Sequence, residues 1–204
     1  MTEISIVVPI YKEYENIKPF LQRTENILKK MEKSYEIIFA LDPSFDNTEE
    51  IILNEIKRNK NIKLLVFSRR FGQPAATMAG ILNCRGSYCV IIDVDLQDPP
   101  ELINELYNKI ISGYEAVYAK RKSRKGETFI KKKISSFAYY FINKLSDVHI
   151  PRDTGDYRII SRKVIDQLSK LNEKHGFLRG MVAFVGFKQS YVQYDRDKRY
   201  AGKG

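Results

Sequence analysis

The sequence predicts an α/β domain with a mostly parallel central sheet and helices on both of its faces. Four short apolar runs, rich in β-branched residues, recur through the first half of the chain, and each is followed by a segment with helical spacing. Strands that alternate with helices form parallel sheets covered on both faces. The runs are also almost continuously hydrophobic, which is typical of strands buried on both sides.

Each element has its own signal in the sequence. The first expected helix has one apolar face, the second is preceded by the capping residues Asp46-Asn47-Thr48, and the fourth follows Pro99-Pro100. Strands are expected at residues 4–10, 35–41, 63–68, 88–93 and 115–119, and helices at 14–33, 48–56, 74–83 and from 101 to near 113.

Length and composition limit the class of protein. With 204 residues, 43% of them hydrophobic, the chain can bury one substantial core, as a single domain or a domain with an appendage. Cys84 and Cys89 are too few and too close together to staple a fold of this size, so we expect buried thiols in a reducing compartment. No window approaches the roughly 18 consecutive apolar residues that span a bilayer.

The net charge of +10 is concentrated in one segment. Eight Lys and Arg residues lie between Lys120 and Lys133 against one acid, Glu127, so this segment holds +7 of the total and the rest is close to neutral. A nucleic-acid module would instead interleave basic and aromatic residues on a platform, and it is disfavoured. P-loop and dinucleotide-binding glycine motifs are absent from the sequence, which argues against nucleotide hydrolases and dehydrogenases.

The expected strands end in polar residues, at the edge of the sheet where open parallel sheets bind ligands. Asp93-Val94-Asp95 is the sharpest of these signals, because two carboxylates at a strand end are hard oxygen ligands. On an extended chain the two side chains point to opposite faces. We therefore assign Asp95 to a divalent cation, Mg²⁺ or Mn²⁺, and Asp93 to the nucleoside side of a ligand.

Five motifs in order resemble the family 2 inverting glycosyltransferases. Within that family they are similar to the polyprenyl-phosphate glycosyltransferases, related to dolichol-phosphate mannosyltransferase and the bactoprenol glucosyltransferases. The motifs are Ile6-Val7-Val8-Pro9-Ile10-Tyr11-Lys12-Glu13, Asp42-x-Ser44-x-Asp46, Ser68-Arg69-Arg70-Phe71-Gly72, Asp93-Val94-Asp95-Leu96-Gln97-Asp98-Pro99-Pro100 and Thr154-Gly155-Asp156-Tyr157-Arg158.

The resemblance implies a GT-A fold, Rossmann-like in its first half, that transfers a hexose-type sugar from a nucleotide-sugar to polyprenyl phosphate. Residues 1–119 would bind the donor and residues 120–204 the acceptor, with a transmembrane region expected after residue 204. Leu41 and Pro43 depart from the family pattern around Asp42, so UDP and GDP both stay open as the nucleotide. The implied nucleotide-sugar-binding residues are Pro9, Tyr11, Glu13, Asp42, Arg69, Gln73, Asp93, Val94, Asp95 and Gln97.

Asp156 is the catalytic base that the resemblance implies. A phosphate monoester has a second pKa of about 6 and is mostly dianionic at neutral pH, so a lipid phosphate needs little proton abstraction. Asp156 would then orient a substrate, whereas a hydroxyl acceptor would require a true base. Asp95 and Arg158 complete the expected catalytic set, and Arg196 and Arg199 are expected to close over the pyrophosphate.

The basic segment fits a phosphorylated acceptor at a membrane. Arg121, Arg124 and Lys125 are expected to bind the lipid phosphate, and an apolar stripe over residues 130–145 predicts an amphipathic helix on an anionic membrane surface. An ordinary core helix with a solvated lysine flank would show the same stripe. The expected location is the cytoplasmic face of the plasma membrane.

The sequence leaves the acceptor class and the oligomeric state open. A family 2 enzyme that acts on a saccharide hydroxyl would have the same first half, and a homo-oligomer is compatible with the sequence. His149 and His175 lack the spacing of metal ligands and are expected to be structural or surface residues.

Overall fold

The computed structural model describes residues 2–122, 154–171 and 178–202. Arg124, Lys125, the expected helix at 130–145 and both histidines lie outside these residues, so what the sequence predicts for them stays a prediction. The strands are β1 (Ile4–Ile10), β2 (Tyr35–Leu41), β3 (Ile62–Val66), β4 (Tyr88–Ile91), β5 (Ala116–Arg121), β6 (Thr154–Ser161) and β7 (Gln189–Tyr194). The helices are α1 (Ile17–Lys30), α2 (Thr48–Arg58), α3 (Gln73–Asn83), η1 (Pro100–Leu102), α4 (Ile103–Ile111), α6 (Arg162–Leu168) and α7 (Leu178–Phe184).

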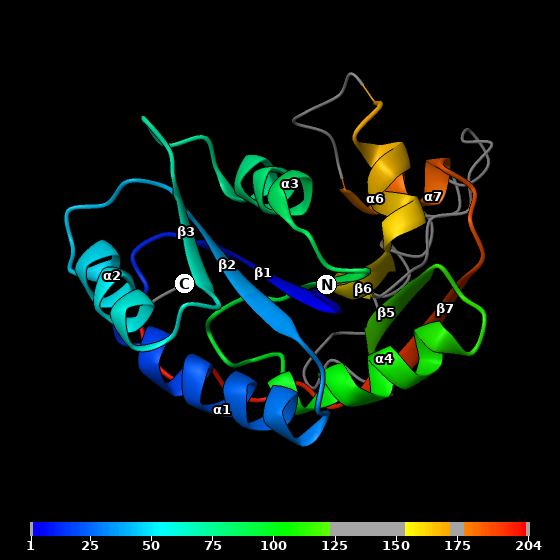
Figure 1. Ribbon diagram of the computed structural model, residues 1–204, viewed down its shortest axis with the longest axis horizontal. Helices are drawn as coiled ribbons and strands as arrows, with labels where there is room; N and C mark the ends of the chain where they lie inside the picture. Colours follow the sequence, from blue (N-terminus) through cyan, green and yellow to red (C-terminus); the bar gives the residue numbers. More distant parts are fainter. Residues whose placement is uncertain (1, 123–153, 172–177, 203–204) are drawn as a thin grey trace, which may run out of the picture.

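Within the described residues, seven strands form one sheet in the order β3-β2-β1-β4-β6-β5-β7. The pairs β1–β2, β1–β4, β2–β3 and β5–β7 are parallel, and β6 runs antiparallel to both of its neighbours. Helices α1, α2 and α4 cover one face of the sheet, and α3, α6 and α7 cover the other (Figure 1). The predicted α/β class and mostly parallel sheet are therefore confirmed.

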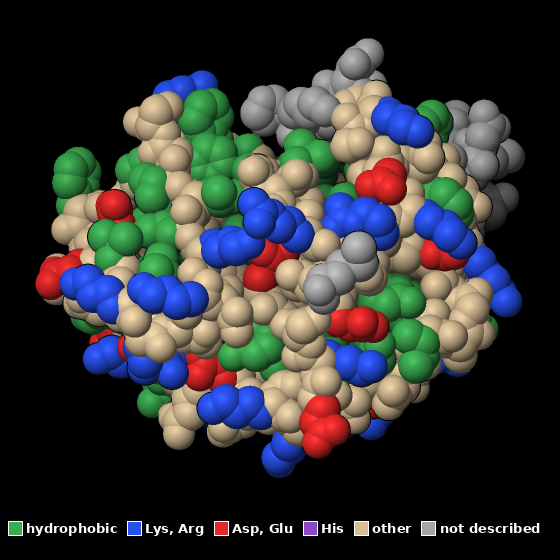
Figure 2. Space-filling model, in the orientation of Figure 1, with side chains coloured by type: hydrophobic (Ala, Val, Ile, Leu, Met, Phe, Trp, Pro, Cys, Tyr) green, Lys and Arg blue, Asp and Glu red, His purple; other side chains and the backbone are tan. Residues whose placement is uncertain are grey.

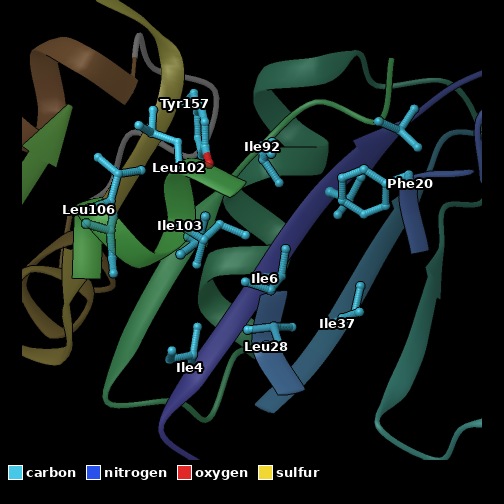
Figure 3. Close-up of a cluster of buried hydrophobic side chains, with 14 of the residues drawn as sticks. Ile4, Ile6, Phe20, Leu28, Ile37, Ile92, Leu102, Ile103, Leu106 and Tyr157 are labelled. Carbon is cyan, nitrogen blue, oxygen red and sulfur yellow. The ribbon is translucent and has the colours of Figure 1, made fainter. Parts of the chain in front are cut away.

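The strand β1 is buried on both sides, which explains its continuous hydrophobicity. Ile4 and Ile6 pack with Phe20 and Leu28 of α1 and with residues of α4 (Figure 3). Val7 enters the core on the opposite face, with side chains of α3 and α6. A Cβ at Gly80 would lie 2.3 Å from Cγ1 of Val7, so the close approach of α3 to the sheet requires a glycine at this position.

The expected boundaries differ from the structure where strands end. The bounds of β1 and β2 agree with the prediction, whereas β3 is Ile62–Val66 instead of 63–68 and β4 stops at Ile91 instead of residue 93. The N–H of Ile92 still donates to the carbonyl of Val7 (3.1 Å), and the chain then leaves the sheet because it turns at Val94 and Asp95. This early end determines the geometry of the candidate site.

The strand β6 was not predicted, and it lies between β4 and β5. It places Arg158 opposite Ile91 of β4 on one side and Tyr118 of β5 on the other. The two expected halves, 1–119 and 120–204, therefore contribute strands to a single sheet, and their assignment to donor and acceptor stays a prediction.

The described surface carries charges of both signs. On the face in Figure 2, Lys and Arg side chains are interspersed with Asp and Glu side chains. In the part of the chain that the structure covers, no helix combines the length and the apolarity needed to cross a bilayer. Cys84 and Cys89 are free and buried, as the sequence predicts.

A buried polar network joins the N-terminal ends of the central strands. Oε1 of Glu36 accepts hydrogen bonds from Oγ of Ser5 (2.6 Å) and the backbone N–H of Arg85 (2.6 Å), and Oε2 pairs with Lys63. Burial acts to raise the pKa of Glu36, but the hydrogen bonds from Lys63, Ser5 and Arg85 outweigh it and hold that pKa below its usual value. The ionised carboxylate therefore stabilises the fold.

Glu36→Gln is expected to lower the free energy of unfolding at pH 7 by about 2 kcal/mol, because an amide cannot satisfy all three donors. A depressed folded-state pKa means that this stabilisation is present above the pKa of the unfolded chain and is lost as pH falls through the folded value. Urea titrations should therefore show less acid-induced loss in the variant than in the wild type below about pH 5. Glu50→Gln, at an exposed position of α2, is the control and should stay within about 0.5 kcal/mol; equal effects of the two variants would contradict a stabilising role of the Glu36 network.

Candidate active site

A pocket of about 270 Å³ opens at the carboxyl ends of β1, β2 and β4. This is the edge of the sheet at which parallel α/β folds bind ligands. Its walls combine backbone from strand ends with charged side chains. The lining residues are Pro9, Ile10, Tyr11, Glu13, Asp42, Arg70, Gly72, Gln73, Ala76, Asp93, Val94, Asp95 and Arg199.

Asp93 and Asp95 line the same pocket, contrary to the expectation that they face opposite sides of a strand. That expectation required an extended chain, but β4 ends at Ile91 and the following residues turn. Oδ1 of Asp95 accepts the backbone N–H of Gln97 (3.1 Å), and Leu96 adopts a φ of 60°. This local hydrogen bond turns the chain and brings both carboxylates to the cavity.

Asp42 shapes the loop between β3 and α3. Its carboxylate is 2% exposed and accepts the backbone N–H groups of Phe71 (3.0 Å) and Gly72 (2.8 Å). Gly72 has a φ of 89°, a left-handed conformation that favours glycine. Asp42 lines the pocket and also holds this loop in place, and its expected contact with a nucleotide stays a prediction.

Two adjacent arginines in that loop have different surroundings. Cζ of Arg70 lies 4.1 Å from the ring centroid of Tyr11, and both residues line the pocket. Cζ of Arg69 instead lies 4.0 Å from the centroid of Phe71, and Arg69 does not line the pocket. Arg69 was predicted and Arg70 was missed, because a pair of neighbouring arginines gives no signal of which one faces the cavity.

The C-terminal segment, residues 195–202, runs from β7 along α1 toward the start of that helix (Figure 1), where the carbonyl of Ala201 accepts Nδ2 of Asn16. The backbone N–H of Asp197 donates to the carbonyl of Gln97 (2.9 Å), and that of Tyr200 donates to the carbonyl of Asp95 (3.2 Å). These bonds hold the segment against the turn after β4. Gln97 thus contributes through its backbone and does not line the pocket.

Arg199 extends from this segment into the pocket wall. Its Nη1 lies 3.3 Å from Oδ2 of Asp95, and its Nη2 pairs with Oε1 of Glu13. Nε donates to the carbonyl of Ala201 (2.9 Å). Arg199 therefore has two carboxylates as its partners in the pocket wall, and its expected closure over a pyrophosphate stays a prediction.

A second ionic group surrounds Asp98, beside the pocket. The buried Asp98 carboxylate accepts the hydroxyl of Tyr194 and lies 3.4 Å from Nε of Arg196 and 3.9 Å from Nη2 of Arg121. Nε of Arg121 also donates to Tyr194 (3.3 Å). Arg121, the expected acceptor residue, and Arg196, an expected pyrophosphate residue, thus lie near the same carboxylate. No sequence pattern indicated this proximity.

Asp156 is contacted by two guanidinium groups on one oxygen. Oδ1 lies 3.2 Å from Nη2 of Arg158 and 3.3 Å from Nε of Arg179. Arg158 is fully buried above the ring of Tyr118, and burial lowers the pKa of Arg158 to about 10. Its Nη1 has no hydrogen-bond partner in the described part of the chain. Arg179 follows a weakly patterned segment and gave no signal in the sequence.

The concentration of negative charge changes the titration of Asp93. Burial raises the pKa of Asp93 to about 7, with further contributions from the charges of Asp98, Asp95 and Asp156, while Arg196 opposes the rise. Nε2 of Gln73 donates to Oδ1 of Asp93 (2.9 Å). An additional positive charge at this point would stabilise the ionised form.

The oxygen donors suit a hard divalent cation that is shared with a ligand. In residues 2–122, 154–171 and 178–202, no three His, Cys, Asp or Glu side chains converge in the manner of a protein-only metal site. Mg²⁺ in particular is usually bound by one or two carboxylates together with substrate phosphates and water. Oδ2 of Asp95 fits such a role, since Oδ1 is engaged in the turn.

Comparison with known proteins identifies the family. Residues 5–169 match the family described as "Glycosyl transferase family 2". Over 201 residues the chain is 44% identical to the "Uncharacterized glycosyltransferase YkcC" of Bacillus subtilis, a match that covers 98% of this chain and 62% of that protein. It is 36% identical over 200 residues to the "Prophage bactoprenol glucosyl transferase homolog" of Escherichia coli, covering 98% of this chain and 65% of that protein. The chain thus spans less than two thirds of the length of both relatives.

Two solved structures share the fold at low sequence identity. Glucosyl-3-phosphoglycerate synthase of Mycobacterium tuberculosis, in complex with Mn²⁺, UDP-glucose and glycerol 3-phosphate, gives a TM-score of 0.66 at 17% identity over 98% of this chain and 73% of that chain. The mannosyltransferase PcManGT of Pyrobaculum calidifontis, in complex with GDP-Man and Mn²⁺, gives 0.61 at 13% identity over 94% and 55%. The sheet and its helices thus have the GT-A architecture, and the chain belongs to glycosyltransferase family 2.

Proposed function

We propose that this chain is the catalytic domain of an inverting glycosyltransferase that moves a hexose-type sugar from a UDP- or GDP-linked donor to polyprenyl phosphate. The observation that carries the proposal is the pocket at the strand ends, which Asp93, Asp95 and Arg199 all line and in which Arg199 pairs with Asp95. The named bactoprenol relative supports the acceptor class, and the ligands named for the two solved structures support the donor class.

The donor occupies the pocket in this proposal. Pro9, Tyr11 and Asp42 lie at the ends of β1 and β2 and hold the base, with Arg70 in place of Arg69 as the adjoining cation. Asp93 faces the ribose, assisted by Gln73. Glu13 and Val94 complete the wall, and residues 1–119 form the donor half.

A divalent cation, Mg²⁺ or Mn²⁺, would be held by Asp95 together with the donor's phosphate oxygens. When bound, such a cation neutralises the charge that grows on the departing nucleoside diphosphate. Arg199 lies beside Asp95 and supplies a second positive charge to the same phosphates. Arg158, with its spare buried donor, adds positive potential from the neighbouring strand β6.

The acceptor approaches on the side of Asp98 in this proposal. Arg121, with Arg124 and Lys125 from outside the described residues, binds the lipid phosphate, and Arg196 lies close to the same carboxylate as Arg121. A phosphate oxygen forms the bond to the anomeric carbon while the bond from that carbon to the diphosphate breaks. The configuration inverts because attack and departure occur on opposite faces of the sugar.

Asp156 acts as an orienting group in this mechanism. Its Oδ1 contacts Arg158 and Arg179, so two guanidinium groups hold the carboxylate in one position. A phosphate acceptor is already mostly ionised, so the reaction does not need a strong base. The acceptor lies in a membrane, and we place the domain at its cytoplasmic face with residues 120–204 toward the lipid.

The decisive assay presents hexose donors linked to UDP and GDP, with Mn²⁺, to polyprenyl phosphate and to an oligosaccharide. We expect sugar on the lipid phosphate, and Asp95→Asn should lower kcat at least about 100-fold because the cation loses its protein ligand. Asp166→Asn, at an exposed position of α6, is the matched control. Transfer only to the oligosaccharide would favour a family 2 enzyme that acts on a saccharide hydroxyl, and unchanged turnover of Asp95→Asn would refute the metal assignment.

Arg121→Ala tests the acceptor site. Loss of a charge-assisted hydrogen bond to phosphate should raise the KM for the lipid at least about tenfold while the donor KM stays within about twofold. Lys109→Ala on α4 is the control and should leave both constants unchanged. Initial rates with each substrate varied in turn measure the effect, and an equal rise in both KM values would count against the acceptor role.

Asp93→Asn tests the charge balance of the pocket. In EDTA at pH 8 the variant should be more stable than the wild type, with a free energy of unfolding higher by about 1–2 kcal/mol. This difference allows for the partial exposure of the Asp93 carboxyl, which weakens the effect of the neighbouring charges. Because the folded pKa is raised to about 7, the wild type loses stability as pH rises from about 4 to 7, and the variant lacks this loss. Urea unfolding at pH 5 and pH 8 measures the difference, and an equal difference at both pH values would contradict the assignment.

A further inference from the structure

Arg199 lies between two carboxylates that the proposed function assigns to the donor pocket. Its Nη1 is 3.3 Å from Oδ2 of Asp95, and its Nη2 pairs with Oε1 of Glu13. The exposed fractions of these side chains are 24% for Arg199, 10% for Asp95 and 15% for Glu13. Ion pairs this far from solvent are screened less than surface pairs, so each contact has a substantial effect on the other two groups.

Several bonds fix the position of the guanidinium. Nε of Arg199 donates to the carbonyl of Ala201 (2.9 Å), and that carbonyl also accepts Nδ2 of Asn16 (3.2 Å). The same Asn16 amide donates to Glu13, and the backbone N–H of Tyr200 donates to the carbonyl of Asp95 (3.2 Å). The contact with both carboxylates is therefore part of an ordered network that includes the start of α1, the turn after β4 and the C-terminal segment.

Arg199 and a divalent cation require the same carboxylate oxygen. Oδ1 of Asp95 accepts the backbone N–H of Gln97, which leaves Oδ2 as the oxygen best placed for a cation, and Oδ2 is the atom that Arg199 contacts. Two positive groups on one oxygen repel each other. A nucleoside diphosphate removes this conflict, because its phosphates give the guanidinium another anionic partner within the same pocket.

We propose that Arg199 couples cation binding to nucleotide binding: it opposes a free divalent cation at Asp95 and permits the cation once a diphosphate engages the guanidinium. This inference rests on the proposed function, since it takes the donor to be a nucleoside diphosphate sugar. The cation then enters with the nucleotide, and departure of the nucleoside diphosphate restores the contact between Arg199 and Asp95.

This coupling role and a simple phosphate contact predict different effects of removing Arg199 on the affinity for the cation alone. If Arg199 only binds phosphate, its removal weakens nucleotide binding and leaves the affinity for the cation alone unchanged. If Arg199 competes with the cation, its removal strengthens the binding of the cation alone. The affinity for the free cation therefore separates the two roles without any measurement of turnover.

The experiment measures Mn²⁺ binding by electron paramagnetic resonance and calorimetry, with and without UDP or GDP. In the wild type, the better of the two nucleotides should raise the affinity for Mn²⁺ at least about tenfold, within the usual range of such couplings. Arg199→Ala should bind Mn²⁺ alone about tenfold more tightly than the wild type, and its nucleotide-dependent gain should shrink by a similar factor. Arg58→Ala is the control: Arg58 of α2 pairs with Glu25 of α1, neither residue lines the pocket, and this variant should bind Mn²⁺ as the wild type does.

Arg199→Lys keeps the charge but cannot bridge both carboxylates, so Mn²⁺ alone should bind it several-fold more tightly. This variant decides the question if Arg199→Ala does not fold. Unchanged or weaker binding of Mn²⁺ alone by the folded variants would overturn the coupling role. Failure of the proposed function looks different: the wild type would bind no Mn²⁺ with either nucleotide, or Asp95→Asn would bind it as well as the wild type.

Discussion

Concentrated negative charge at one edge of a parallel sheet is the constraint on which the rest of this structure depends. The parallel pairing of β1 with β2 and β4 brings three strand ends to one place, with Asp42, Asp93 and Asp95 beside them. Strand β6 then adds Asp156 from a distant part of the sequence. The raised pKa of Asp93 shows what this costs, because burial and three neighbouring carboxylates disfavour its ionised form.

The surrounding arginines offset this charge in separate groups. Arg199 contacts Asp95, Arg196 lies near Asp98, and Arg179 contacts Asp156. A phosphate or a cation bound beside any of these guanidinium groups would change the local balance of positive and negative charge. The unfavourable charge is tolerated because apolar cores cover both faces of the sheet, while the ionised Glu36 joins the strands at the opposite edge. The Glu36 network thus stabilises one end of the strands whose other ends form the proposed site.

The features that the sequence predicted correctly are those that local patterns and motifs determine. The bounds of β1 and β2, the helices that follow the strands and the confirmed family all came from continuous apolar runs and motif order. Strand β6 was not predicted, because its place between β4 and β5 depends on partners far away in the sequence. The turn at Asp95 was missed because a single side-chain-to-backbone bond to Gln97 ends the extended chain. The choice between Arg69 and Arg70 depended on loop geometry that Asp42 determines.

The turn after β4 and the C-terminal segment connect the two sides of the site. Asp95 lines the proposed donor pocket and Asp98 lies near Arg121, yet the two carboxylates are separated by only two residues of one turn. The chain from Tyr194 to Tyr200 binds this turn at three points: the Tyr194 hydroxyl at Asp98, the Asp197 amide at Gln97 and the Tyr200 amide at Asp95. A shift of this segment therefore changes the surroundings of both carboxylates together. Arg196 and Arg199 belong to the same segment. A movement of this segment would therefore change the positive charge near Asp98, on the proposed acceptor side, and near Asp95, on the proposed donor side, at the same time.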